Sequence, residues 1–313
     1  MHATVAVDIP NQDQEARMRR PRWWLSLLCL VALQVQAQEV VRQDEFLHGE
    51  RPEAWAMNRV AAASLLTAFG ESPRLDPGQW ALAAEAGNVP RLSASQRRVG
   101  FYGDKIEDLN KSPAFARLRL QVGLPAGWVA EFGYTPPLTI NGARPHKLLA
   151  ASIGRRLIDR GAFSLSARAF GQHGAIDGDI TCPRDLAQVT DPEQNPYGCE
   201  AASNDRISVN DYGLDLSAGW SVGPWHWHAT GGVVRTELQA QVDALTFGFR
   251  DRSRLVADGV LRYAALGVRR DFGTHWSIGT EVLHVPLDVR RGPDAPVRSE
   301  PLTSWRLQLR YAR

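Results

Sequence analysis

The sequence predicts an all-β fold, an antiparallel transmembrane β-barrel of about twelve strands. Apolar and polar residues alternate strictly in segments such as Leu118-Arg-Leu-Gln-Val122. Alternation with period two gives a strand with one apolar and one polar face. An export signal precedes these segments, and the connections between them are alternately short and long along the chain. Together these features are typical of a barrel in an outer membrane.

Residues 1–37 have the pattern of a signal peptide. A basic stretch with Arg17, Arg19, Arg20 and Arg22 is followed by an apolar run over 23–35 and by the small-x-small site Val35-Gln36-Ala37. Met18 is an alternative start. A membrane anchor is the other reading, but the apolar run is short for a bilayer. We therefore expect a signal peptide over 1–37, a periplasmic N-terminal segment over 38–54 and the barrel over 55–313.

Composition narrows the function classes. The chain has 36 basic and 34 acidic residues, and this near-zero balance argues against a nucleic-acid partner. Beyond the signal, no segment approaches the roughly 20 apolar residues of a membrane-spanning helix. Cys182 and Cys199 enclose a segment rich in Pro, Asn, Asp and Gly, which favours a disulfide formed after export. Two unpaired thiols are the alternative, and the spacing matches no zinc motif.

Twelve segments are expected as strands. The first, 55–69, is alanine-rich and could also be helical. In chain order the strands are 55–69, 80–89, 98–102, 114–123, 128–134, 147–157, 163–172, 212–222, 225–228, 255–269, 275–286 and 305–311. An even number places both ends of the barrel on the periplasmic side.

Connection lengths predict the topology. Short links at 124–127, 158–162, 223–224 and 271–274 alternate with long ones at 135–146, 173–206, 246–254 and 288–303. Short turns belong to the periplasmic side of such barrels, and long loops lie outside the cell. Five tryptophans close to the short links predict an aromatic girdle at that interface: Trp128, Trp220, Trp225, Trp227 and Trp276.

The polar faces of the strands should point into the lumen. The residues expected there are Arg117, Arg119, Glu131, Arg168, Asp211, Asp215, His226, His228, Glu281, Arg306 and Arg310. Their mixed charges can pair and plug the interior, or they can leave a narrow polar path. His226 and His228 share a face, but no third ligand is visible, so we expect no metal and no cofactor.

His275, Ser277 and Glu281 form the one constellation that resembles catalysis. Outer-membrane lipid hydrolases such as phospholipase A and the lipid A deacylases use a His-x-Ser pair, in which Ser277 would be the nucleophile and His275 the base. Those families follow the serine with asparagine, where this chain has Ile278, and their serine faces lipid. An enzyme is therefore the less favoured reading.

Three runs resemble those of an uncharacterised family of proteobacterial outer-membrane β-barrel proteins: Val99-Gly-Phe-Tyr-Gly-Asp-Lys-Ile-Glu-Asp-Leu-Asn-Lys111, Gly133-Tyr-Thr-Pro-Pro137 and Asn195-Pro-Tyr-Gly-Cys199. The resemblance implies a location and a fold, and supplies no site residues. We expect a monomer among outer-membrane lipid and lipopolysaccharide, inserted by the barrel assembly machinery. It would act as a narrow channel or a structural surface protein, with a lipid hydrolase and a soluble periplasmic β-sandwich as alternatives.

Overall fold

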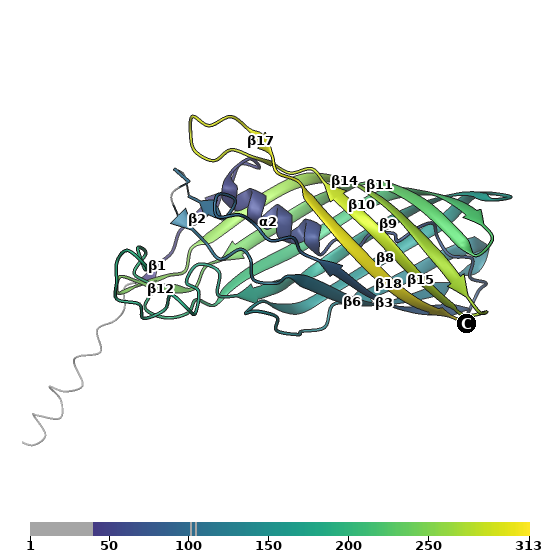
Figure 1. Ribbon diagram of the computed structural model, residues 1–313, viewed down its shortest axis with the longest axis horizontal. Helices are drawn as coiled ribbons and strands as arrows, with labels where there is room; N and C mark the ends of the chain where they lie inside the picture. Colours follow the sequence, from purple (N-terminus) through teal and green to yellow (C-terminus); the bar gives the residue numbers. More distant parts are fainter. Residues whose placement is uncertain (1–39, 101, 104) are drawn as a thin grey trace, which may run out of the picture. The chain divides into compact units, whose positions relative to one another are not determined.

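A computed structural model describes residues 40–100, 102–103 and 105–313 of the chain. The signal peptide predicted over 1–37 lies outside the described residues. Ten antiparallel strands form one closed barrel (Figure 1), because β11 pairs with both β10 and β14. The barrel strands are β3 (Trp80–Asn88), β6 (Ala114–Gly123), β7 (Trp128–Tyr134), β8 (Arg144–Arg160), β9 (Phe163–Gly178), β10 (Asp205–Val222), β11 (Trp225–Gln241), β14 (Arg254–Phe272), β15 (Trp276–Val285) and β18 (Leu302–Ala312). Closure rules out a β-sandwich.

Alternation sets which side of the wall each side chain takes. On β10, Leu214 and Leu216 are 67% and 54% exposed on the outside, whereas Asp211 and Asp215 are each 4% exposed on the inside. The same pattern holds along β6 and β18. Each barrel strand pairs with its sequence neighbours in the barrel, and the last strand, β18, closes the circle by pairing with β3.

Two of the twelve predicted strands are not barrel strands. Among the described residues of the predicted strand 98–102, Arg98 and Val99 form β4 (Arg98–Val99), which pairs with β5 (Lys105–Ile106) in a separate two-stranded sheet. Residues 55–69 begin in the helix α2 (Pro52–Ala63) and continue without regular secondary structure. Pro52 occupies the first turn, where its missing N–H costs nothing, and alanine has the highest helix propensity. The alanine content therefore indicated a helix, and the strand prediction was wrong.

Helix α2 and the residues after it lie inside the barrel. The helix packs against β10, β11, β14 and β18, and most of its side chains are buried, including Trp55 at 1% exposed. The chain then runs through the lumen over 64–73 and turns into β3 at Trp80. We call residues 52–73 the plug.

The two ends of the barrel differ. One end carries the short connections at 124–127, 161–162, 223–224 and 273–275, together with the C-terminal end of β18. The other carries the longer connections over 89–113, 135–143, 179–204, 242–253 and 286–301, in which β12 (Ala244–Thr246), β13 (Phe249–Asp251), β16 (Asp288–Val289) and β17 (Arg298–Ser299) form. Within the described residues, no helix is both long enough and apolar enough to cross a membrane.

The described N-terminal residues lie at the end with the longer connections. There β1 (Val40–Val41) pairs with β13, and β2 (Asp44–Phe46) pairs with the first residues of β14. A periplasmic segment over 38–54 and extracellular long loops therefore cannot both be right, because the structure places 40–46 beside those connections. The sequence pattern missed this because it does not show that the chain crosses the lumen before the first barrel strand.

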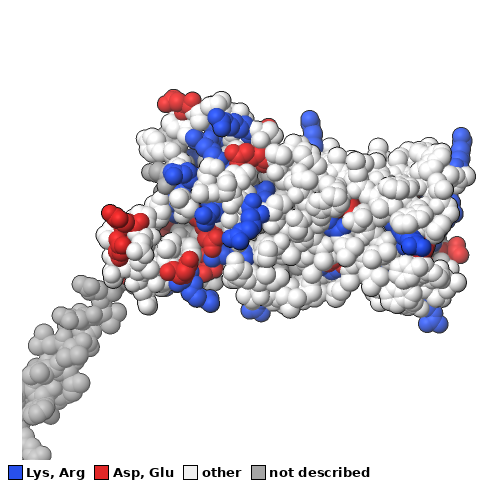
Figure 2. All heavy atoms as spheres, in the orientation of Figure 1, with Lys and Arg blue, Asp and Glu red and all other residues white. Residues whose placement is uncertain are grey.

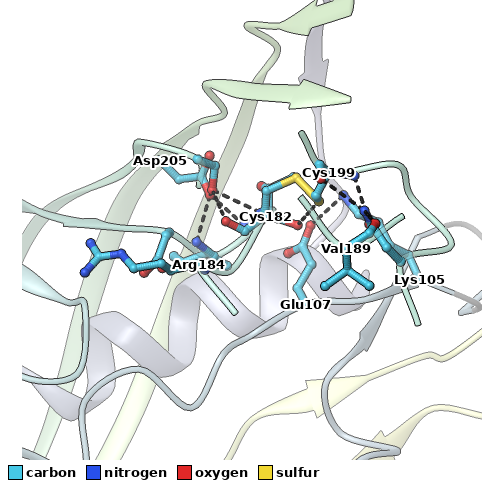
Figure 3. The surroundings of a disulfide bond; sticks show 12 residues. Lys105, Glu107, Cys182, Arg184, Val189, Cys199 and Asp205 are labelled. Carbon is cyan, nitrogen blue, oxygen red and sulfur yellow. Dashed lines mark hydrogen bonds and ion pairs between the residues drawn. A yellow bond between two sulfur atoms is a disulfide. The ribbon is translucent and has the colours of Figure 1, made fainter. Parts of the chain in front are cut away.

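Cys182 and Cys199 form the disulfide that their spacing suggested (Figure 3). The carboxylate of Asp205 accepts hydrogen bonds from the backbone N–H groups of Ile180 and Thr181 and from the hydroxyl of Ser203. Cys199 also forms an isolated bridge with Thr246 of β12. The disulfide thus closes a loop within the 179–204 connection, and the bridge from Cys199 joins this loop to the small sheet formed by β1, β13 and β12.

Candidate functional site

Four arginines of the barrel wall surround the C-terminal end of α2. They are Arg117 and Arg119 on β6, Arg168 on β9 and Arg306 on β18, and we call them the arginine cluster. Each is at most 8% exposed. The last carbonyl groups of a helix have no partner within the helix and form the negative end of its dipole. The wall therefore places positive charge at the part of the plug that needs hydrogen-bond donors.

Six consecutive backbone carbonyls, from Ala62 to Thr67, accept hydrogen bonds from this cluster. Arg306 donates to Leu65 at 2.6 Å, to Ala63 at 3.2 Å and to Ala62 at 3.4 Å. The other three donate as follows: Arg117 to Ser64 at 2.6 Å, Arg119 to Thr67 at 2.9 Å, and Arg168 to Leu66 at 2.6 Å and to Thr67 at 3.1 Å. Such charge-assisted bonds are stronger than neutral ones.

Acidic side chains on adjacent strands balance most of these charges. Arg119 contacts Glu131 at 2.5 Å and Glu85 at 3.0 Å, and Glu85 also lies 3.3 Å from Arg306. Burying an unpaired charge is costly, so the pairing is what permits arginines inside the barrel.

Arg168 has its acidic partner directly across the strand pair. Asp215 of β10 is its register partner, and their side chains meet at 2.6 Å. The hydroxyl of Tyr263 donates a further hydrogen bond to Asp215 at 2.7 Å. Arg117 instead contacts the amide oxygen of Gln172 at 2.5 Å and lies over the ring of Phe115.

Residues 68–73, the part of the plug nearest the short turns, fit the wall closely. The backbone N–H of Ser72 donates to the hydroxyl of Ser166 at 2.9 Å, and Arg156 donates to the Ser72 carbonyl at 2.8 Å. A Cβ atom added at Gly219 would lie 2.6 Å from the Glu71 carboxylate. Glycine at this position of the wall therefore leaves the space that the Glu71 side chain occupies. The cavity beside residues 68–73 measures about 20 Å³, enough for about one water molecule.

The residues predicted to face the lumen lie on the inner side of the wall. Those below 9% exposed are Arg117, Arg119, Glu131, Arg168, Asp211, Asp215, His228, Glu281 and Arg306, whereas His226 and Arg310 are half-buried. Many of them contact the plug or the acids that balance the arginine cluster. Sequence reasoning missed the plug itself, for which the only signals were Pro52 and the alanine run.

The two histidines on the inner face have separate partners. His226 bonds to Ser221 and to Asp271, each at 2.8 Å. His228 lies 3.4 Å from Glu281 and beside the ring of Phe69. Among the described residues there is no group of three or more His, Cys, Asp or Glu side chains placed to hold a metal ion.

The structure does not assemble the catalytic constellation of the lipid hydrolases. His275 is exposed just before β15 begins, and its ring contacts the Ala312 carbonyl at 2.9 Å. Ser277 is 3% exposed on the inner face, and its hydroxyl has no hydrogen-bond partner among the described residues. Glu281 contacts His228 instead. The proposed base is therefore exposed in the turn before β15, whereas the proposed nucleophile is buried on the inner face.

The outer surface of the barrel is mostly apolar between two boundaries, and the exposed side chains of Arg235 on β11 and Arg262 on β14 also face outward there. Trp128, Trp220 and Trp276 are exposed near the short turns. At the other end the outward-facing residues become polar in one cross-strand row, His173, Asn210, Glu237 and Asp258. In Figure 2, charged side chains gather at the end with the longer connections, and the middle of the visible face has few.

The height of this belt matches lipid. On β10 it runs from Tyr212 to Val222, roughly 33 Å of strand at about 3.3 Å per residue, or about 25 Å in height at a typical tilt. Apolar side chains exposed over such a height on a closed barrel are stable in hydrocarbon, where every backbone group must be paired. The barrel spans an outer membrane.

A comparison with protein-family models and with curated proteins finds no match. Among solved structures, the chain is similar to Ail, the attachment invasion locus protein of Yersinia pestis, at 10% identity over 76% of this chain and 99% of that chain, with a TM-score of 0.30. The outer membrane protease OmpT from Escherichia coli is similar at 8% identity, 75% and 92% coverage and a TM-score of 0.36. The toluene transporter TodX of Pseudomonas putida follows at 12% identity, 86% and 98% coverage and a TM-score of 0.33. These values are low, so we base the membrane assignment on the barrel's own surface.

The Arg168–Asp215 pair offers a test of the buried network. Replacing Arg168 with Met leaves the Asp215 carboxylate buried without its cation, which should reduce the free energy of unfolding by about 3 to 5 kcal/mol. The double variant Arg168→Met/Asp215→Asn removes both charges and should recover at least half of that loss. Urea unfolding of the purified barrel measures both, and equally small losses in the two variants would show that the pair is not buried.

Proposed function

We propose that the protein is a sealed outer-membrane barrel that acts as a structural surface protein. The observation that supports this most is that the chain's own residues 52–73 occupy the lumen and are bonded to the wall along their length. An open polar path would need water where these residues lie. The first alternative, a channel, requires the plug to leave the lumen. The second, a lipid hydrolase, requires His275 to contact Ser277, but His275 contacts the Ala312 carbonyl.

We further propose that the end with the longer connections faces outward. Short turns are periplasmic in outer-membrane barrels, which puts the disulfide-bonded connection and residues 40–46 at the cell surface. In this topology residues 40–46 lie outside, and the chain then crosses the membrane within its own barrel and enters β3 from the periplasmic end. The surface structure then includes the disulfide, the β1-β13-β12 sheet and the two-stranded sheets β16-β17 and β4-β5.

We also propose that the protein lies in a proteobacterial outer membrane, with lipid and lipopolysaccharide around the belt, and that the barrel assembly machinery inserts it. The exposed apolar side chains of the belt support the contact with lipid. Closure of β18 on β3 leaves no unpaired barrel edge for another copy, which favours a monomer.

Conductance measurements separate a sealed barrel from a channel. In planar bilayers the wild-type protein should show no steady conductance, because the plug fills the lumen. Deleting residues 43–73 should leave the ten barrel strands intact, let water solvate the arginine cluster and give stable open-channel steps. As a control, deleting 293–296 in an outer connection should leave the barrel closed. Steady wild-type conductance equal to that of the plug deletion would contradict the proposal.

Thiol labelling tests the orientation. Gly49→Cys places a thiol in an exposed turn before the plug, where a Cβ atom meets nothing within 4 Å. Thr274→Cys places one in an exposed short turn. A membrane-impermeant maleimide should label the first variant in intact cells and the second only after the outer membrane is permeabilised. The reverse pattern would place the N-terminal residues in the periplasm.

A further inference from the structure

We infer that a pocket between α2 and the barrel wall binds a small, uncharged, apolar molecule of about the size of benzene. The pocket has a volume of about 140 Å³. On the helix side it is lined by Ala56, Val60 and Ala63, and on the wall side its apolar residues include Phe115, Leu148 and Ile207. This inference goes beyond the sealed-barrel proposal, because it assigns a ligand to the interior.

The charged residues at the pocket already have partners. Lys111 contacts Asp108 at 2.7 Å and Asp179 at 3.0 Å. Arg59 donates to the Pro90 carbonyl at 2.7 Å. The remaining charged lining residue, Asp177, is bonded to Arg206 at 2.6 Å. A ligand with its own charge would have to compete with these existing contacts, so the site favours an uncharged molecule.

The ion pair between Lys111 and Asp179 is stabilised by the surroundings of the Asp179 carboxylate. Burial by itself would raise the pKa of this carboxyl group, yet the hydrogen bonds from Lys111 and from the backbone N–H of Arg184 hold it below the ordinary value. The ion pair therefore persists at neutral pH, and Lys111 is not available to an anionic ligand.

Volume and packing set the size of the occupant. Protein interiors hold few voids larger than a water molecule, and an empty apolar one deprives its lining of contacts. An apolar cavity of about 150 Å³ engineered in another protein stays dry and accepts benzene. The small side chains of Ala56 and Ala63 face larger aliphatic ones on the wall, so the space arises where the helix presents little bulk.

Residues that line the pocket border it toward both ends of the barrel. The 135–143 connection borders it at the end with the longer connections, where Leu138 is 59% exposed. Toward the short turns lies Ser64, whose carbonyl is held by Arg117. A molecule that enters from the outer end would thus be retained beside the plug and not passed through the barrel.

Fluorine NMR of fluorobenzene tests this site. The protein is placed in lipid nanodiscs, and line broadening is measured against empty nanodiscs to remove partitioning into lipid. Wild-type protein should show a saturable component. Val60→Phe puts a ring into the pocket and should weaken binding at least tenfold, whereas Val233→Phe, the same change on the lipid-facing surface, should leave it unchanged.

Two results would overturn the inference: no saturable component with folded wild-type protein, or equal binding by folded Val60→Phe protein. Folding is checked by heat-modifiable migration on a gel. If Val60→Phe does not fold, Val60→Leu adds a single methylene at the same place and should weaken binding several-fold, and unchanged binding would again reject the site. The conductance and labelling results do not depend on this pocket, so either proposal can fail without the other.

Discussion

The structure depends on hydrogen bonds between four wall arginines and six consecutive carbonyls at the end of a helix. Helix α2 ends at Ala63 inside a closed barrel, so its last carbonyls and those of the segment that follows have no water to bond, and unpaired buried acceptors are costly. Arg306 and its neighbours supply the donors, and Glu85, Glu131 and Asp215 balance the charges that come with them. The plug and the wall thus satisfy each other's buried polar groups and pack as one unit.

This coupling bears on how the chain assembles. The plug lies between residues 40–46, at one end of the barrel, and Trp80, at the other. The strand that follows it, β3, is also the strand that closes the barrel by pairing with β18. Closing the sheet and enclosing the plug are therefore linked steps, and a barrel that closed without the plug would leave the donors of the arginine cluster without their carbonyl acceptors.

Much of the wall could be predicted from the sequence, and the plug could not. Period-two alternation located β10 and the inward side of Arg168 and Asp215, because each strand has lipid on one side and a polar interior on the other. The strand predicted over 225–228 was too short. Gly231 and Gly232 interrupt the alternation, but β11 continues through them to Gln241. A segment surrounded by wall on all sides has no exposed face, so 55–69 lacked the periodicity that would have distinguished a helix from a strand. The partners of the arginines are backbone carbonyls, which no residue pattern displays.

The most direct test is a cross-link between plug and wall. Ser72 and Ser166 are hydrogen-bonded inside the barrel, and the two cysteines of the described chain are already joined to each other. Oxidation of Ser72→Cys/Ser166→Cys protein in outer membranes should yield a linked 72–166 peptide by mass spectrometry. The control pair Ser72→Cys/Ser208→Cys, with the second cysteine on the outer face of β10, should not link. A folded barrel in which residues 72 and 166 fail to link would contradict a plug held in the lumen.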